Sequence, residues 1–158
     1  MMRLLFPRQA DNHYRGHRSA LWLFGVDLLI RTGVGAGTLF NGRTAAANAD
    51  GIPLATFGSA GAQAFMSIFA AWGLSQLMLS AVALVVLLRY RSLVPFMFSV
   101  LLVEHVARRV VFIVLPMPRI GSPPGFWINV VLLGLLVVGL MLSLWRRSDP
   151  VPPGAPDA

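Results

Sequence analysis

The stretch "GAQAFMSIFAAWGLSQLMLSAVALVVLL", residues 61–88, decides the fold class of this chain. It contains no Asp, Glu, Lys or Arg. It is also longer than the about 20 apolar residues that carry a helix across the hydrocarbon core of a membrane. The stretch therefore predicts a membrane-spanning helix.

Three further stretches are apolar and long enough to span a membrane, namely residues 20–40, 93–115 and 126–145. The joint "RYRS", residues 89–92, is too short for anything but an antiparallel hairpin between the second and third spans. We therefore expect an all-α fold, an integral membrane four-helix bundle with up-down-up-down topology.

The arginines predict the orientation of the bundle, because cytoplasmic connections carry an excess of basic residues. Two connections hold one arginine each, Arg43 and Arg119. The N-terminal segment, the joint after the second span and the tail hold the larger group: Arg3, Arg8, Arg15, Arg18, Arg89, Arg91, Arg146 and Arg147. Both termini are predicted to be cytoplasmic, with residues 1–19 as a basic segment, 20–145 as the transmembrane domain and 146–158 as a Pro-rich, disordered tail.

The composition excludes several classes of protein. Of 158 residues, 56% are hydrophobic and 12% charged, against about 25% charged in soluble domains. The net charge of +7 comes from arginines alone, and most of them flank apolar spans, so we expect the lipid bilayer and not nucleic acid as partner. An arginine-only set is typical of a GC-rich bacterial genome. With no cysteine there is no disulfide or thiolate metal site. From the apolar spans and the bacterial composition we expect a multi-pass protein of the bacterial inner membrane.

The first span has an alternative interpretation as a signal peptide, because "AAANA", residues 45–49, offers an Ala-x-Ala cleavage site. Asp27 and Arg31 interrupt the apolar stretch, which is also longer than the usual apolar core of a signal peptide. We favour an uncleaved first helix.

Residues at the ends of the predicted spans are expected to meet the lipid interface. Trp22, Trp127 and Trp145 lie near span ends, where aromatic belts form, whereas Trp72 falls in the middle of a span. Arg109 is expected to snorkel towards the interface.

Small residues are expected to let the helices approach closely. They recur every fourth residue in three sets: Gly33 and Gly37 in the first span, and Ala60 and Ala64 and then Ser67, Ala71 and Ser75 around the second. We favour packing inside the bundle, with a homodimer seam as the alternative.

Ionisable residues inside the spans mark the candidate site. A central Asp, Glu or Arg that faces lipid costs about 2.5–3.5 kcal/mol, so such residues pair. Asp27 and Arg31 are one turn apart on the first helix, as are Glu104 and Arg108 on the third. His105 and Arg109 form a similar pair beside them.

The first and third spans run in the same direction, which places Arg31 and Glu104 at similar depth. The second span brings Gln76 to that level. The sequence therefore predicts a buried polar cluster in the bundle interior: Asp27, Arg31, Gln76, Glu104, His105 and Arg108. We favour Arg31 over Arg108 as the main partner of Glu104, and structural and functional roles for the cluster both stay open.

Four spans, short joints and "VDLLIRTGVGAGTLFN", residues 26–41, resemble the DoxX-like group of small bacterial membrane proteins. The resemblance covers about residues 20–145. Some members of that group are subunits of quinone-linked membrane oxidoreductases, so the resemblance implies an accessory role. It transfers no catalytic residue to this chain.

Three classes of function remain, in this order. The first is a non-catalytic accessory or scaffold subunit of a larger membrane complex, with a membrane-protein partner or as a homo-oligomer. The second is a quinone- or lipid-binding oxidoreductase or isomerase subunit that uses Glu104 and His105 for proton transfer. The third is a small oligomeric transporter. No metal site, phosphate loop or catalytic motif is recognisable in the sequence. The sequence therefore favours a protein that is not an enzyme. No cofactor is expected, although a quinone or a lipid is a possible ligand.

Overall fold

The computed structural model describes residue 5, residue 7 and residues 9–145. These residues contain helices and no strand, so the predicted all-α class is confirmed. The part of the chain that is described holds four long helices: α2 (Arg18–Phe40), α4 (Ser59–Arg89), α5 (Val94–Val114) and α6 (Pro124–Leu144). Predictions for Arg3, Arg8, Arg146, Arg147 and the tail 146–158 lie outside the described residues.

The helices begin and end close to the predicted spans. α6 begins at Pro124 because proline at the first helical position loses no hydrogen bond. The connection after α2 contains three short helical turns: α3 (Gly42–Thr44), the π-type turn η1 (Ala45–Ala49) and the 3₁₀ turn η2 (Leu54–Thr56). A further 3₁₀ turn, η3 (Arg91–Leu93), joins α4 to α5.

Three helices, α2, α4 and α6, are long and apolar enough to cross a membrane. They indicate a membrane protein. α5 has a similar length, but it carries Glu104, Arg108 and Arg109 within its 21 residues. Its charged residues therefore need partners inside the bundle if it lies in the same bilayer.

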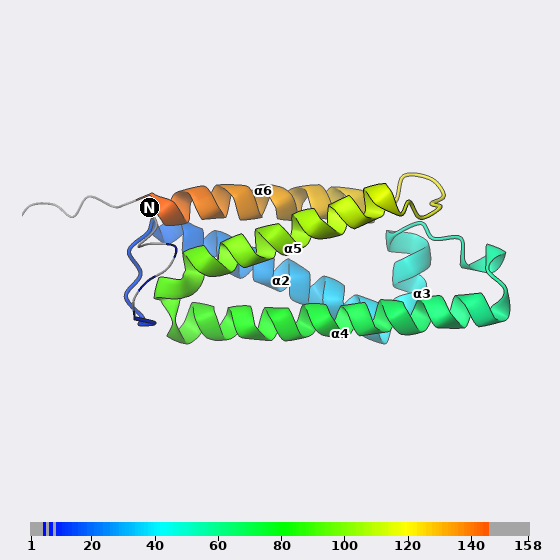
Figure 1. Cartoon of the computed structure of the whole chain (residues 1–158), viewed down its shortest axis with the longest axis horizontal. Helices are drawn as coiled ribbons and strands as arrows, with labels where there is room; N and C mark the ends of the chain where they lie inside the picture. Colours follow the sequence, from blue (N-terminus) through cyan, green and yellow to red (C-terminus); the bar gives the residue numbers. More distant parts are fainter. Residues whose placement is uncertain (1–4, 6, 8, 146–158) are drawn as a thin grey trace, which may run out of the picture.

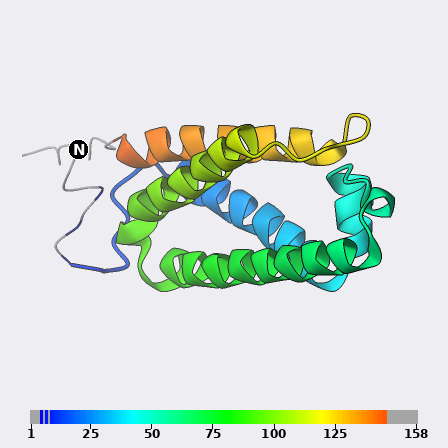
Figure 2. The same cartoon turned by 45° about the vertical axis from the view of Figure 1, so that its right-hand side comes forward.

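The helices are arranged around α2 (Figure 1). α2 packs against α4 along one side and α6 along another, and α5 packs against α6. α4 and α5 meet at the turn that joins them and then diverge, as both views show (Figures 1 and 2). We call the end with this turn the terminal end, since α2 begins and α6 ends there, and the opposite end the loop end.

Two glycines set the closest approach of α2 and α4. A Cβ atom on Gly73 would lie 3.0 Å from the backbone oxygen of Gly35 and 3.0 Å from the backbone nitrogen of Leu39. Both glycines are buried. Only residues without a side chain allow the two backbones to come this close, so Gly35 and Gly73 fix the crossing of the longest helix with the central one.

The small residues predicted to pack inside the bundle are exposed, except for the half-buried Gly37. Gly33 is exposed with no neighbour near its Cβ position. Ser67, Ala71 and Ser75 lie on the outward face of α4, where the two hydroxyls donate to carbonyls of their own helix. The spacing alone could not tell the inward from the outward face, because α4 is apolar all round.

Apolar side chains form two clusters, one at each end of the bundle. At the terminal end Phe24 and Phe98 meet edge to face, with ring centroids 4.9 Å apart, at the centre of the larger cluster. At the loop end Ala46, Ile52 and Phe69 form the smaller one. Asp27, Arg31, Gln76 and His105, which are buried and polar, lie between these clusters.

Backbone contacts close both ends. Ser92 donates its backbone N–H and its hydroxyl to the carbonyl of Asp11, which ties the N-terminal segment to the α4–α5 turn. At the loop end Ile120 donates its N–H to the carbonyl of Gly51 at 2.8 Å. Gly51 has φ of +67°, a conformation in which a side chain would be strained.

Candidate functional site

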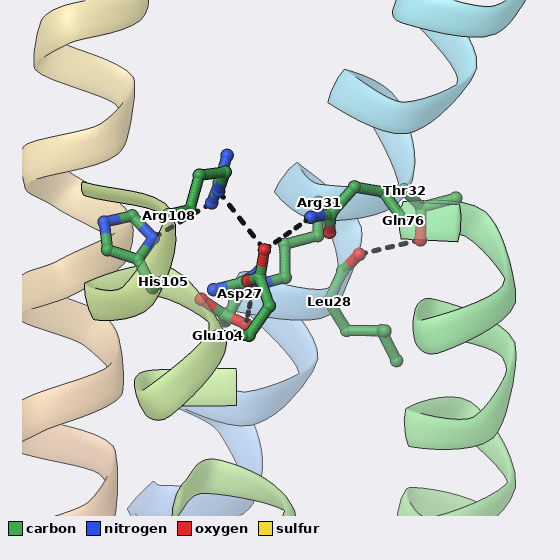
Figure 3. A network of polar contacts seen from close by, with 8 residues as sticks. All are labelled: Asp27, Leu28, Arg31, Thr32, Gln76, Glu104, His105 and Arg108. Atoms are coloured by element: carbon green, nitrogen blue, oxygen red, sulfur yellow. Dashed lines mark hydrogen bonds and ion pairs between the residues drawn. The ribbon is translucent and has the colours of Figure 1, made fainter. Parts of the chain in front are cut away.

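An ionic network crosses the bundle between α2 and α5. Arg31 donates through Nε to Asp27 Oδ2 at 3.0 Å and through Nη1 to Glu104 Oε2 at 3.1 Å (Figure 3). Arg108 Nε lies 3.2 Å from Glu104 Oε1. The relative accessibility is 0% for the Asp27 side chain, 3% for Arg31 and 27% for Glu104. Arg31 thus links both acidic residues, and Glu104 contacts both arginines.

Gln76 joins this network from α4. Its amide Nε2 donates to Glu104 Oε1 at 2.9 Å. Glu104 is therefore the residue at which α2, α4 and α5 meet, although α4 and α5 have few other contacts away from their turn. A carboxylate held by three side chains fixes the register of three helices at once.

His105 takes a different position from its neighbour Glu104. Its ring is buried, and Nδ1 lies 3.3 Å from Nη2 of Arg108. Successive helical residues point about 100° apart, so Glu104 faces α2 and α4 while His105 does not line the cavities described below. No hydrogen bond joins the Glu104 and His105 side chains among the described residues. Their use in proton transfer stays a prediction.

Several buried polar atoms, in the network and beside it, have no hydrogen-bond partner in the described part of the chain. They include Asp27 Oδ1, Arg31 Nη2, His105 Nε2 and Ser80 Oγ. Buried donors and acceptors are rarely left unsatisfied. Water or a polar group of a ligand is the partner expected at these atoms.

The wider cavity, of about 520 Å³, lies between α4 and α5 towards the loop end. Its apolar wall contains Phe65, Ile68 and Phe69 of α4 and Phe112 of α5. The rings of Phe65, Phe69 and Trp72 stack in sequence along this wall. The polar lining is Asp50, Glu104, Arg108, Arg109, Arg119 and Asn129. Its volume and mixed lining are typical of small-molecule sites.

A narrower chamber of about 180 Å³ adjoins the wider cavity inside the bundle. Arg31, Thr38 and Gln76 line it, and Trp72 and Arg108 line both spaces. The guanidinium carbon of Arg108 lies 5.2 Å from the ring centroid of Trp72, which is cation–π geometry. The Arg108–Trp72 pair thus stands between the two spaces, with Arg31 and Gln76 lining the inner chamber and Glu104 lining the wider cavity.

Three residues that line both spaces lie outside the predicted cluster. Trp72 lines both spaces, as do Asp50 from the long connection and Asn129 from α6. Trp72 and Asn129 each had a signal in the sequence. Trp72 places an indole N–H inside an apolar span, and Asn129 places a side-chain amide inside another. Asp50 had none, because its approach to Arg108 and Arg119 depends on how the connection folds over the loop end.

Asp50 lies outside the apolar helices, and its charge state affects the cavity. Burial raises the pKa of the Asp50 carboxyl above its ordinary value, and the positive charges of Arg119 and Arg108 oppose this shift. The neutral form of Asp50 is therefore favoured more than in an exposed aspartate.

The residues predicted for the lipid interface are on the surface near helix ends. Trp22, Trp127 and Trp145 are largely exposed. Arg109 is half-buried, lies over the ring of Phe126 and lines the wider cavity. Contact of these four residues with lipid stays a prediction.

Among the described residues no three His, Asp or Glu side chains gather in a way that could hold a metal ion. The polar groups of the site are instead arginines, carboxylates and amides, which suit hydrogen bonding to an organic ligand or its headgroup. No protein-family model, curated protein or solved structure matches the chain.

Proposed function

We propose that the protein is a multi-pass protein of the bacterial inner membrane in which α2, α4, α5 and α6 all cross the bilayer, with the terminal end in the cytoplasm. The arginine distribution supports this orientation. The ionic network supports the insertion of α5, because Glu104 and Arg108 are paired towards the bundle instead of facing lipid alone.

Cysteine labelling tests the topology directly, since the chain has no native cysteine. In intact cells, a membrane-impermeant thiol reagent is expected to label Asn48→Cys, on the exposed surface of the loop end. Arg89→Cys, at the terminal end, is expected to react only after the cells are opened. The reverse pattern would overturn the orientation, and labelling of both sites in intact cells would overturn the bilayer placement.

We propose that the protein binds a membrane-soluble amphiphile between α4 and α5. The cavity of about 520 Å³ carries this proposal. Its aromatic wall suits an acyl or isoprenoid chain, and its polar residues suit a headgroup. Ile68 and Val111 line the cavity and are themselves largely exposed, so a ligand can enter from the side, out of the bilayer.

Filling the cavity is expected to remove the bound amphiphile. Ala107 lines the cavity on α5, whereas Val103, one turn earlier, is exposed outside it. Ala107→Trp should lose the lipid that co-purifies with the wild-type chain in mild detergent, as measured by native mass spectrometry. Val103→Trp is the matched control and should retain it. Equal retention by both variants, at unchanged melting temperature, would contradict the proposal.

A non-catalytic accessory subunit is the second candidate function. The outward face of α4 supports it, because its small residues Ala64, Ser67, Ala71 and Ser75 leave room for close approach of another helix. Stoichiometric recovery of a partner protein, lost in Ala71→Phe, would favour this role. A monomer without partner under mild detergent would argue against it.

Membership in the DoxX-like group stays a prediction, as does the choice between lipid and quinone as ligand.

A further inference from the structure

The cations of the wider cavity differ in how they are paired. Glu104 accepts hydrogen bonds at both of its carboxylate oxygens, from Arg31 and Gln76, and it also contacts Arg108. Both carboxylate oxygens of Glu104 are therefore engaged inside the network. In the described part of the chain no ion pair joins Glu104 to the two remaining arginines of the lining, Arg109 and Arg119.

Arg109 and Arg119 have no carboxylate within ion-pair distance in the described part of the chain. Each lies against an aromatic ring instead. The guanidinium carbon of Arg109 is 5.8 Å from the Phe126 centroid, and that of Arg119 is 5.5 Å from the Phe112 centroid. A guanidinium that stacks on a ring keeps its in-plane N–H groups for an acceptor beside it.

Asp50 is the other acid in this lining. Burial raises the pKa of its carboxyl, and the charges of Arg119 and Arg108 oppose that shift. Even with Asp50 ionised, the lining holds three arginines, Arg108, Arg109 and Arg119, against two acids, Asp50 and Glu104. The polar end of the cavity therefore has a surplus of positive charge next to an apolar, aromatic wall.

We infer that the amphiphile bound between α4 and α5 is anionic, with a phosphate or carboxylate headgroup held by Arg109 and Arg119 and its chain along Phe65, Phe69 and Phe112. This inference rests on the proposed binding of an amphiphile. Guanidinium groups match phosphate and carboxylate geometry, and both arginines lie where the cavity reaches the loop end. A neutral quinone offers neither guanidinium an anionic partner.

The test uses the full chain in nanodiscs of phosphatidylcholine. Phosphatidylglycerol, oleate, ubiquinone or inorganic phosphate is added, and retained molecules are counted by native mass spectrometry. We expect retention of phosphatidylglycerol and oleate in preference to ubiquinone and phosphatidylcholine. Inorganic phosphate should neither bind alone nor displace them. Equal or better retention of ubiquinone, or tight binding of phosphate alone, would overturn the inference.

Substitutions of Arg109 and Arg119 test whether these two arginines cause the preference for anionic lipids. Arg109→Gln with Arg119→Gln should weaken retention of the anionic lipids by roughly tenfold or more, the effect of losing charge-assisted hydrogen bonds. The double variant Arg109→Lys with Arg119→Lys should keep part of the binding of anionic lipids, because lysine keeps the positive charge. Arg43→Gln is the matched control, since Arg43 is exposed on α3 at the same end and does not line the cavity. An unchanged lipid preference in the double glutamine variant would contradict the inference.

The outcomes separate this inference from the proposed function. If the wild-type chain retains an amphiphile that Ala107→Trp loses, but without preference for anionic headgroups, the binding site stands and the headgroup assignment fails. If no amphiphile of any charge is retained, both fail. Circular dichroism recognises a loss of folding in the double glutamine variant. In that case the double lysine variant is the test, and a complete loss of the preference for anionic lipids in a folded lysine variant would contradict the headgroup assignment.

Discussion

Glu104→Gln is expected to lower the free energy of unfolding by about 3–5 kcal/mol, the cost of breaking a buried ion pair in soluble interiors. The substitution keeps the size of the side chain but removes its charge. Arg108 then has no carboxylate within ion-pair distance among the described residues, and Arg31 retains only Asp27. Reversible unfolding in mixed micelles and the melting temperature measure the loss.

Two double variants show whether charge balance is the cause. Glu104→Gln with Arg108→Gln removes one charge of each sign and leaves the Asp27–Arg31 pair intact, so it should recover much of the stability. Arg31→Leu with Glu104→Leu also removes one of each, but it leaves Asp27 buried without a cation and should stay destabilised. Equal stability of the two double variants would show that the network is not organised around Arg31.

Gly73→Leu is expected to destabilise the fold by about 3 kcal/mol or more, because overpacking already costs about 1–3 kcal/mol where side chains can move. Here the new Cβ would meet backbone atoms of Gly35 and Leu39 at 3.0 Å. α2 and α4 would have to separate, which would also move Gln76 and Arg31 apart. Melting temperature and protein yield from membranes are the measurements.

Gly33→Leu is the matched control for this substitution. Gly33 is on the same helix as Gly35, with no atom within 4 Å of its Cβ position. Replacement of an exposed helical glycine should leave stability unchanged or raise it by up to about 1 kcal/mol. Similar losses for Gly33→Leu and Gly73→Leu would show that the α2–α4 crossing is not set by glycine.

The apolar stretches predicted the helices well because their signal lies in local sequence. α4 follows from a long stretch without charge, and α6 from an apolar stretch after Pro123 and Pro124. The connection at residues 41–58 was not predicted, since its turns depend on contacts such as Gly51 with Ile120 across the loop end. Local propensity does not contain that information.

For the candidate site, helical spacing and depth were enough to bring Arg31, Gln76 and Glu104 into one group. The same reasoning treated Arg108 as a lesser alternative, whereas the structure gives Glu104 contacts with both arginines. The cavity itself could not be predicted, because it depends on the divergence of α4 and α5, which spacing along one helix does not define. Trp72 and Asp50 line this cavity, so their part in the site could not be predicted either.

Fluorescence quenching of Trp72 tests most directly the central claim that a chain from the bilayer enters between α4 and α5. Trp22, Trp127 and Trp145 are replaced by phenylalanine, and the protein is placed in nanodiscs of phosphatidylglycerol with brominated acyl chains. We expect strong quenching of Trp72, which lines the cavity, and much weaker quenching when Ala107→Phe fills the space beside it. Equal quenching with and without Ala107→Phe, or no quenching in either, would contradict the account.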